Sequence, residues 1–136
     1  MTNVSRRSFL KAGALAIPTL IASRSLGLAR TVAPSNRIAM GFIGCGGRMH
    51  AVADVFLRNP EVQPVAVCDV VRTNREAFRV KMGLQPANSH NDFRDLVART
   101  DIDAVAIATP DHWHVIPSIA AMKSGKDVYC EKPLSN

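Results

Sequence analysis

The chain has 136 residues, of which 47% are hydrophobic, which is enough apolar surface for one buried core and argues against a disordered protein. Its formal net charge of +6 is misleading, because residues 1–29 hold four of the 17 basic residues and none of the 11 acidic ones. The remainder is nearly neutral, and no basic patch alternates with aromatic residues, so we expect no nucleic-acid binding. The three cysteines show no Cys-x-x-Cys spacing, which ranks metal and disulfide roles low.

Residues 1–29 are similar to a twin-arginine export signal. The motif Ser5-Arg6-Arg7-Ser8-Phe9-Leu10-Lys11 precedes the apolar stretch 12–21, which is too short for a membrane span, and small residues follow at Gly27-Leu28-Ala29. We expect export by the twin-arginine translocase, cleavage after Ala29 and a periplasmic or secreted mature protein. An uncleaved membrane anchor and a chance pair of arginines are the alternatives.

A strand, a tight turn and a helix are predicted after a polar linker at residues 30–36. The apolar run Ile38 to Ile43 leads into glycines 44, 46 and 47, and a helical pattern covers about 48–58. This order favours a dinucleotide site, because Gly44 would permit the turn and Gly46 would let a pyrophosphate approach the backbone at a helix N-terminus. The third small position of that fingerprint is occupied by Met49.

The rest of the chain alternates between strand and helix patterns. The predicted strands are 62–69, 104–108 and 127–130, with room for a short strand in the loop 84–91, and the predicted helices are 73–82, 92–99 and 114–123. The run 104–108 is continuously apolar, as in a parallel sheet covered on both faces. The sequence therefore predicts an α/β fold with a doubly wound, Rossmann-like parallel sheet.

Chemically distinctive residues follow several of these strands and would meet at one edge of the sheet, where open parallel sheets bind ligands. Asp69 ends the second strand and is placed to accept hydrogen bonds from an adenosine ribose; it is also a candidate helix N-cap, and both roles can hold together. His112 and His114 are too few for a zinc site. Lys132 is either a solvated lysine or, if buried, a group suited to proton transfer, and Pro133 favours a cis peptide bond.

Two motifs on this edge resemble the Gfo/Idh/MocA oxidoreductase family over about residues 37–136. They are Asp103-Ala104-Val105-x-Ile107-Ala108-Thr109-Pro110-Asp111-x-x-His114 and Ala121-x-x-x-Gly125-Lys126-x-Val128-x-Cys130-Glu131-Lys132-Pro133. The family binds NAD or NADP in a Rossmann domain and usually oxidises or reduces a hydroxyl of a sugar or cyclitol. Asp111 departs from the asparagine that many members have.

The resemblance implies a role for individual residues. Gly44, Gly46 and Gly47 would cradle the pyrophosphate, and Asp69 would bind the adenosine ribose, which favours NAD over NADP. Lys132 would be the catalytic lysine. The remaining cofactor contacts would come from Thr109, Pro110 and His114 at the nicotinamide half and from Glu131 beside the lysine. Met49, in the place of a small residue, would weaken the cofactor site.

The resemblance also implies more chain than the 136 residues supply. A family member has a further helix and strand in its sheet and a second domain for substrate, so we expect residues 37–136 to be an incomplete NAD(P)-binding domain of a longer enzyme. That enzyme would be an exported oxidoreductase and, at full length, a homo-oligomer. A glycosidase that uses bound NAD and a non-catalytic nucleotide-binding module are the competing hypotheses.

Overall fold

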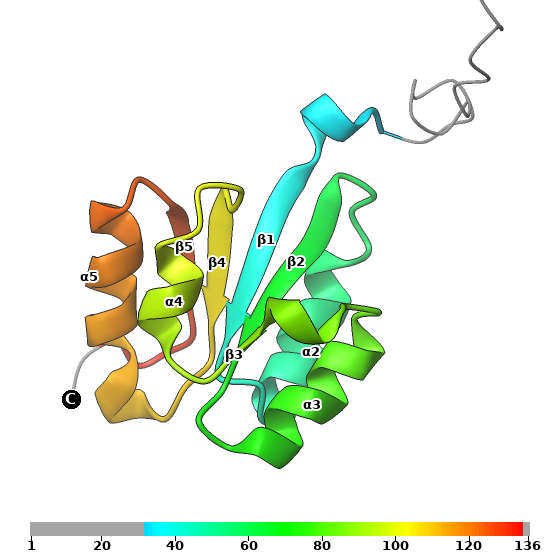
Figure 1. Ribbon diagram of the computed structural model, residues 1–136. Coiled ribbons are helices and arrows are strands. Elements are labelled where there is room, and N and C mark those ends of the chain that lie inside the picture. Colours follow the sequence, from blue (N-terminus) through cyan, green and yellow to red (C-terminus); the bar gives the residue numbers. More distant parts are fainter. Residues whose placement is uncertain (1–31, 135–136) are drawn as a thin grey trace, which may run out of the picture.

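The computed structural model describes residues 32–134, so the expected export signal lies outside the described residues (Figure 1). The described part of the expected linker contains a short 3-10 turn, η2 (Pro34–Asn36). The strands are β1 (Ile38–Ile43), β2 (Val62–Cys68), β3 (Ser89–His90), β4 (Ala104–Ile107) and β5 (Asp127–Cys130). The helices are α2 (Gly47–Phe56), α3 (Arg72–Lys81), α4 (Phe93–Val97) and α5 (Val115–Lys123), with 3-10 turns η3 (Pro86–Asn88) and η4 (Asp111–Trp113).

All five strands pair in parallel in the order β3-β2-β1-β4-β5. Chain order therefore reverses between β1 and β4, which is the topological switch point where ligands bind in such sheets. Helices α2 and α3 cover one face of the sheet, and α4 and α5 cover the other (Figure 1). The predicted doubly wound α/β sheet is confirmed.

The sheet separates the core into two apolar clusters. One holds Phe42, Met49 and Phe78 under α2 and α3, and the other holds Leu96, Val105 and Ile107 under α4 and α5. All four residues of β4 are buried, because neighbouring strands and helices on both faces enclose it. The continuous apolar run 104–108 predicted this burial.

The predicted boundaries are close to the observed ones, and two local features could not be predicted in detail. Helix α4 ends at Val97, although the pattern predicted it to run to Arg99, and Asp92 caps its start by accepting from the Arg94 N–H at 2.8 Å. In β2, Pro64 has no N–H to donate, and the register with β1 shifts between Met40 and Gly41 beside it.

None of the helices within residues 32–134 has the length and apolar character needed to cross a membrane.

Gly44 marks the place where β1 and β4 diverge. Its φ is +84°, a conformation that side chains disfavour, and a Cβ on it would lie 2.6 Å from the Thr109 nitrogen and 2.8 Å from the Ala108 oxygen. The end of β1 therefore touches the backbone that follows β4. Only glycine permits this contact, which fixes the floor of the crevice between the two strands.

We expect Gly44→Ala to lower the free energy of unfolding by roughly 2 kcal/mol or more, since the added methyl group meets rigid backbone in a strained conformation. Urea unfolding followed by circular dichroism measures the change. Gly46→Ala is the matched control, because Gly46 has a φ of −72° and no atom lies within 4 Å of its added Cβ. Equal stability of the two variants would contradict the role of Gly44.

Candidate functional site

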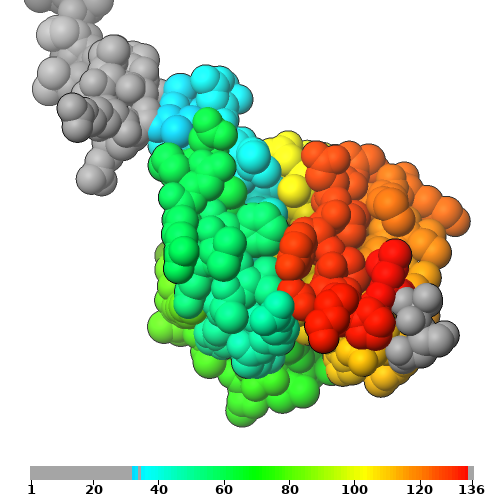
Figure 2. Space-filling view, turned by 180° about the vertical axis from the view of Figure 1, so that it is seen from behind, coloured from blue at the N-terminus to red at the C-terminus, as the bar shows by residue number. Residues whose placement is uncertain are grey.

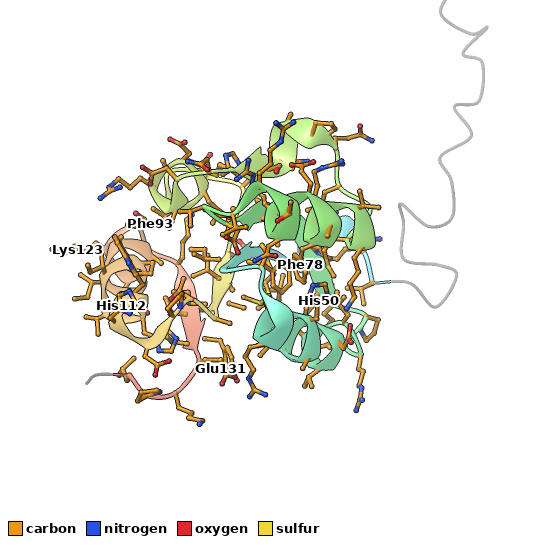
Figure 3. The ribbon with its side chains drawn as sticks, turned by 90° about the horizontal axis from the view of Figure 1, so that it is seen from below. His50, Phe78, Phe93, His112, Lys123 and Glu131 are labelled. Carbon is orange, nitrogen blue, oxygen red and sulfur yellow. The ribbon has the colours of Figure 1, made fainter. Side chains whose placement is uncertain are left out.

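The sheet brings the predicted site residues to one edge, at the carboxyl ends of β1, β2, β4 and β5. Figure 3 views the molecule from this side, with Glu131 beside the start of α2 and His112 at the start of the opposite helical layer. The convergence follows from the parallel pairing, which aligns Ile43 with Cys68 on one side and with Ile107 on the other. The sequence prediction that these groups meet is therefore confirmed.

The glycine loop leaves its outer side open. A Cβ placed on Gly46 or on Gly47 would meet no atom within 4 Å, so packing among the described residues does not require glycine at either position. The N-terminus of α2, which begins at this loop, has no side-chain cap, so no side chain occupies its first N–H groups. The loop thus fits a bulky anionic group that approaches the backbone closely, as a dinucleotide pyrophosphate does.

Asp69 connects the loops after β1 and β2. One carboxylate oxygen accepts from the Cys45 N–H at 2.7 Å, and the other accepts from the Val71 N–H at 2.7 Å. The additional role as helix N-cap is wrong, because the N-cap of α3 is Val71. Each carboxylate oxygen has further lone pairs, so Asp69 retains acceptor capacity for ribose hydroxyls.

Arg75 supports this arrangement from α3, and sequence reasoning missed it. Its guanidinium Nη1 donates to the Asp69 carbonyl at 2.5 Å and to the Asn91 side chain at 3.1 Å, which joins the loops after β2 and β3. The side chain is 13% exposed. Arg72 lies closer to Asp69 in the chain than Arg75 does, and spacing alone gives no signal that separates the two arginines.

A pocket of about 350 Å³ opens beside Gly44 and Asp69 on the side of α4 and α5. Its walls come from the loops after four strands and are mostly apolar, and they include Val70, Phe93, Pro110, Trp113 and Pro117. Pockets with a few polar groups in apolar walls are the usual form of a small-molecule site. Its position continues the crevice from the glycine loop toward Asp69.

Thr109 and His114 lie behind the crevice. Thr109 Oγ1 is a buried polar atom without a hydrogen-bond partner among the described residues. His114 is only 1% exposed, and its ring nitrogens face two backbone carbonyl oxygens: Nε2 lies 2.9 Å from that of Thr109 and Nδ1 lies 2.6 Å from that of Pro133. Pro110 is exposed at the pocket wall.

Glu131 lies at the β5 end of this sheet edge, directly after the strand. It is 7% exposed, and its Oε1 accepts from Arg48 Nη2 at 2.9 Å and from the Tyr129 hydroxyl at 2.8 Å. The Arg48 guanidinium, followed by the Tyr129 hydroxyl, lowers the pKa of Glu131 below its usual range. Glu131 therefore stays ionised and links α2 to the end of β5; Figure 2 shows these two segments side by side. Sequence reasoning did not identify Arg48 or Tyr129.

Lys132 is exposed at the end of this strand, and its peptide bond to Pro133 is cis. The sequence had left a solvated and a buried lysine as alternatives, and within residues 32–134 the side chain is not buried. No described residue supplies the water-excluding wall that a proton-transfer lysine needs.

The cysteines and histidines give no sign of metal chemistry. Burial, followed by the charge of Asp69, raises the pKa of Cys45 and raises that of Cys68 to about 12, so both thiols stay protonated and inert. Cys45 and Cys68 belong to core clusters on opposite faces of the sheet. No group of three or more metal-binding side chains occurs in the described part of the chain.

The comparisons with known proteins agree with this geometry. A family model described as "Oxidoreductase family, NAD-binding Rossmann fold" (Gfo/Idh/MocA) matches residues 38–136. A curated relative from Solibacter usitatus, named "Glycosyl hydrolase family 109 protein", is 35% identical over 98% of this chain and 34% of its own length. The chain thus spans about a third of the curated relatives it matches.

Two solved structures have the same fold and contain a cofactor. Scyllo-inositol dehydrogenase from Lactobacillus casei, with bound NAD(H) and scyllo-inositol, is 30% identical with a TM-score of 0.64 over 73% of this chain and 29% of that one. A 3-ketoreductase from Actinomadura kijaniata, in complex with TDP-benzene and NADP, is 26% identical with a TM-score of 0.66 over 74% of this chain and 31% of that one.

The fold, the open glycine loop and the family match agree, and NAD and NADP both occur among the neighbours. Residues 38–136 belong to the Gfo/Idh/MocA oxidoreductase family, as its NAD(P)-binding Rossmann domain.

Proposed function

We propose that this chain is the nucleotide-binding part of an exported NAD-dependent oxidoreductase that acts on a CH–OH group of a sugar or cyclitol. The observation that supports it best is the open side of Gly46 and Gly47 at the switch point of the sheet, next to a pocket and on the same sheet edge as Lys132. A bound nicotinamide supplies the acceptor for the hydride that leaves the alcohol carbon. The protein has to bind the cofactor and to accept the hydroxyl proton.

Different residues at the carboxyl edge of the sheet bind different parts of the cofactor in this proposal. Gly44 sets the floor, and the open backbone of Gly46 and Gly47 receives the pyrophosphate at the start of α2. Asp69 accepts hydrogen bonds from the adenosine ribose with its remaining lone pairs. Thr109 and Pro110 border the nicotinamide half from the end of β4.

Lys132 is the group that we assign to the proton. In the oxidation, the Lys132 amine would accept the hydroxyl proton as the hydride leaves the alcohol carbon, and in the reduction it would return that proton to the alkoxide. The amine is exposed among residues 32–134, so the substrate itself, or protein outside these residues, has to exclude water from it.

Cofactor choice tests the role of Asp69. We expect NAD to bind at least about tenfold more tightly than NADP, because a carboxylate about 4 Å from the 2′-phosphate costs roughly 1–4 kcal/mol. Asp69→Asn should reduce this preference while keeping an acceptor oxygen. Isothermal titration of both cofactors measures it, with Asp54→Asn on the far part of α2 as the control. Equal or tighter binding of NADP to the unchanged protein would refute the assignment.

Turnover tests the role of Lys132. In the full-length enzyme, Lys132→Ala should lower the turnover rate by about a hundredfold or more, the usual effect of losing an acid–base group, with NAD affinity nearly unchanged. Stopped-flow measurement of NADH formation and calorimetry give the two quantities. Lys123→Ala, at the exposed end of α5, is the control. A Lys132→Ala enzyme with normal turnover would leave the lysine as a solvated side chain.

A glycosidase with bound NAD is the second candidate, and the names of the curated relatives favour it. Both reactions begin with hydride abstraction from a sugar carbon, so residues 38–136 serve either. The two differ in the balance of products: a dehydrogenase accumulates NADH in proportion to substrate, whereas this glycosidase releases the aglycone with no net NADH. Incubation with an aryl glycoside, followed at the wavelengths of NADH and of the aglycone, separates them.

Export by the twin-arginine translocase into the periplasm is part of the proposal, and so is a homo-oligomer at full length. The double change Arg6→Lys and Arg7→Lys should retain the precursor in the cytoplasm, because the translocase reads the planar guanidinium pair. Immunoblots of cell fractions measure the distribution, and Arg24→Lys is the control within the same segment. Normal export of the doubly changed protein would disprove the signal.

A further inference from the structure

We propose that Glu131 and His114 are positioning residues that hold Lys132 from its two sides. This inference rests on the proposed role of Lys132 and changes the roles that the family resemblance implied for Glu131 and His114, which were contacts to the cofactor. The evidence for the positioning role is the set of groups that the Glu131 carboxylate and the His114 ring nitrogens contact. Both side chains bond to groups of this chain, and together they anchor the residues directly before and after Lys132, which are Glu131 and Pro133.

On the amino side of Lys132, Glu131 is fixed by three connections. Its backbone N–H donates to the Ile107 oxygen at 2.9 Å, which continues the pairing of β4 and β5. Its Oε1 receives the Arg48 guanidinium and the Tyr129 hydroxyl. The ring of Tyr129 in turn packs edge-on against Phe56 at the end of α2, with ring centroids 5.2 Å apart. Both ends of helix α2 therefore help to fix Glu131: Arg48 near its start bonds to the Glu131 carboxylate, and Phe56 at its end packs against Tyr129.

On the carboxyl side, the Pro133 carbonyl oxygen lies 2.6 Å from Nδ1 of His114. The other ring nitrogen of His114 lies 2.9 Å from the carbonyl oxygen of Thr109, at the end of β4. Both neighbours are acceptors, so the ring contributes at least one donated proton to this bridge. The bridge ties the segment after β5 to the segment after β4.

Lys132 therefore lies between two fixed residues while its own side chain is exposed. Such an arrangement orders the backbone of a reactive residue before substrate arrives, and catalysis depends on that order because small displacements are costly in rate. His114 is 1% exposed with both nitrogens used, which leaves no ring atom for the nicotinamide. Glu131 Oε1 accepts hydrogen bonds from two donors of this chain, Arg48 and Tyr129.

The test measures hydrogen–deuterium exchange of the amides in residues 131–134 by mass spectrometry, without nucleotide. Arg48→Met should accelerate exchange there about three- to fivefold, the scale of one solvent-exposed ion pair, and Arg48→Lys should restore most of the protection. Lys81→Met is the matched control, because it breaks the 2.7 Å pair to Asp54 on the same helix α2 and should leave residues 131–134 unchanged.

Two further variants address the remaining contacts. Glu131→Gln, which keeps an acceptor oxygen, should accelerate exchange less than Glu131→Ala. His114→Gln should accelerate exchange at Leu134. If His114→Gln fails to fold, the Arg48 and Glu131 variants still decide the proposal, because Arg48 is exposed and its loss leaves the core intact.

NAD titration of the same full-length proteins distinguishes the competing roles. Faster exchange with unchanged NAD affinity supports positioning. Unchanged exchange in Arg48→Met and Glu131→Ala overturns it, and weaker NAD binding in those variants would then restore Glu131 as a cofactor contact. Failure of the unaltered protein to bind NAD would reject the proposed function alone, since the exchange rates report on the two contacts independently of nucleotide.

Discussion

The contact between the ends of β1 and β4 at Gly44 is the constraint on which the site depends. The two strands pair side by side, yet the chain leaves them toward opposite faces, to α2 from one and to α5 from the other. A crevice must open where they diverge. Because Gly44 lets the backbones touch at Thr109, the crevice has a solid floor, and the glycine loop and the pocket lie on either side of it.

The loops around this crevice are held by polar side chains that reach backbone groups of distant segments. Asp69 bonds to the Cys45 N–H, Arg75 to the Asp69 carbonyl, and His114 bridges Thr109 and Pro133. Such bonds shape loops that have little apolar surface to bury. They also decide what remains for a ligand. With these side chains occupied, and with the N–H groups of Gly44 and Cys45 bonded within the protein, the backbone N–H groups of Gly46 and Gly47 and the spare lone pairs of Asp69 are left for a ligand.

Sequence patterns predicted the elements well, because β1 and β4 are continuous apolar runs and local signals end the helices, as at Gly83 with its φ of +67°. They also predicted the edge where the site forms, which depends only on parallel pairing. The partners of Glu131 could not be predicted. Arg48 lies 83 positions away, and their contact arises from the packing of α2 beside β5, which no local pattern encodes. For the same reason, the spacing of His114 gave no sign that both ring nitrogens face carbonyls.

Met49 shows that one position of a nucleotide motif can change without disturbing the rest. A small residue there ordinarily allows a helix to approach a strand closely. Met49 is fully buried instead, in a cluster that also contains Ala53, Ala104 and Ala106. Large side chains are tolerated in a core when neighbouring ones are small, and methionine adapts well to irregular space. Since Met49 is buried in the core while Gly46 and Gly47 border open space, its size is accommodated by packing beneath α2, away from the open side of the glycine loop.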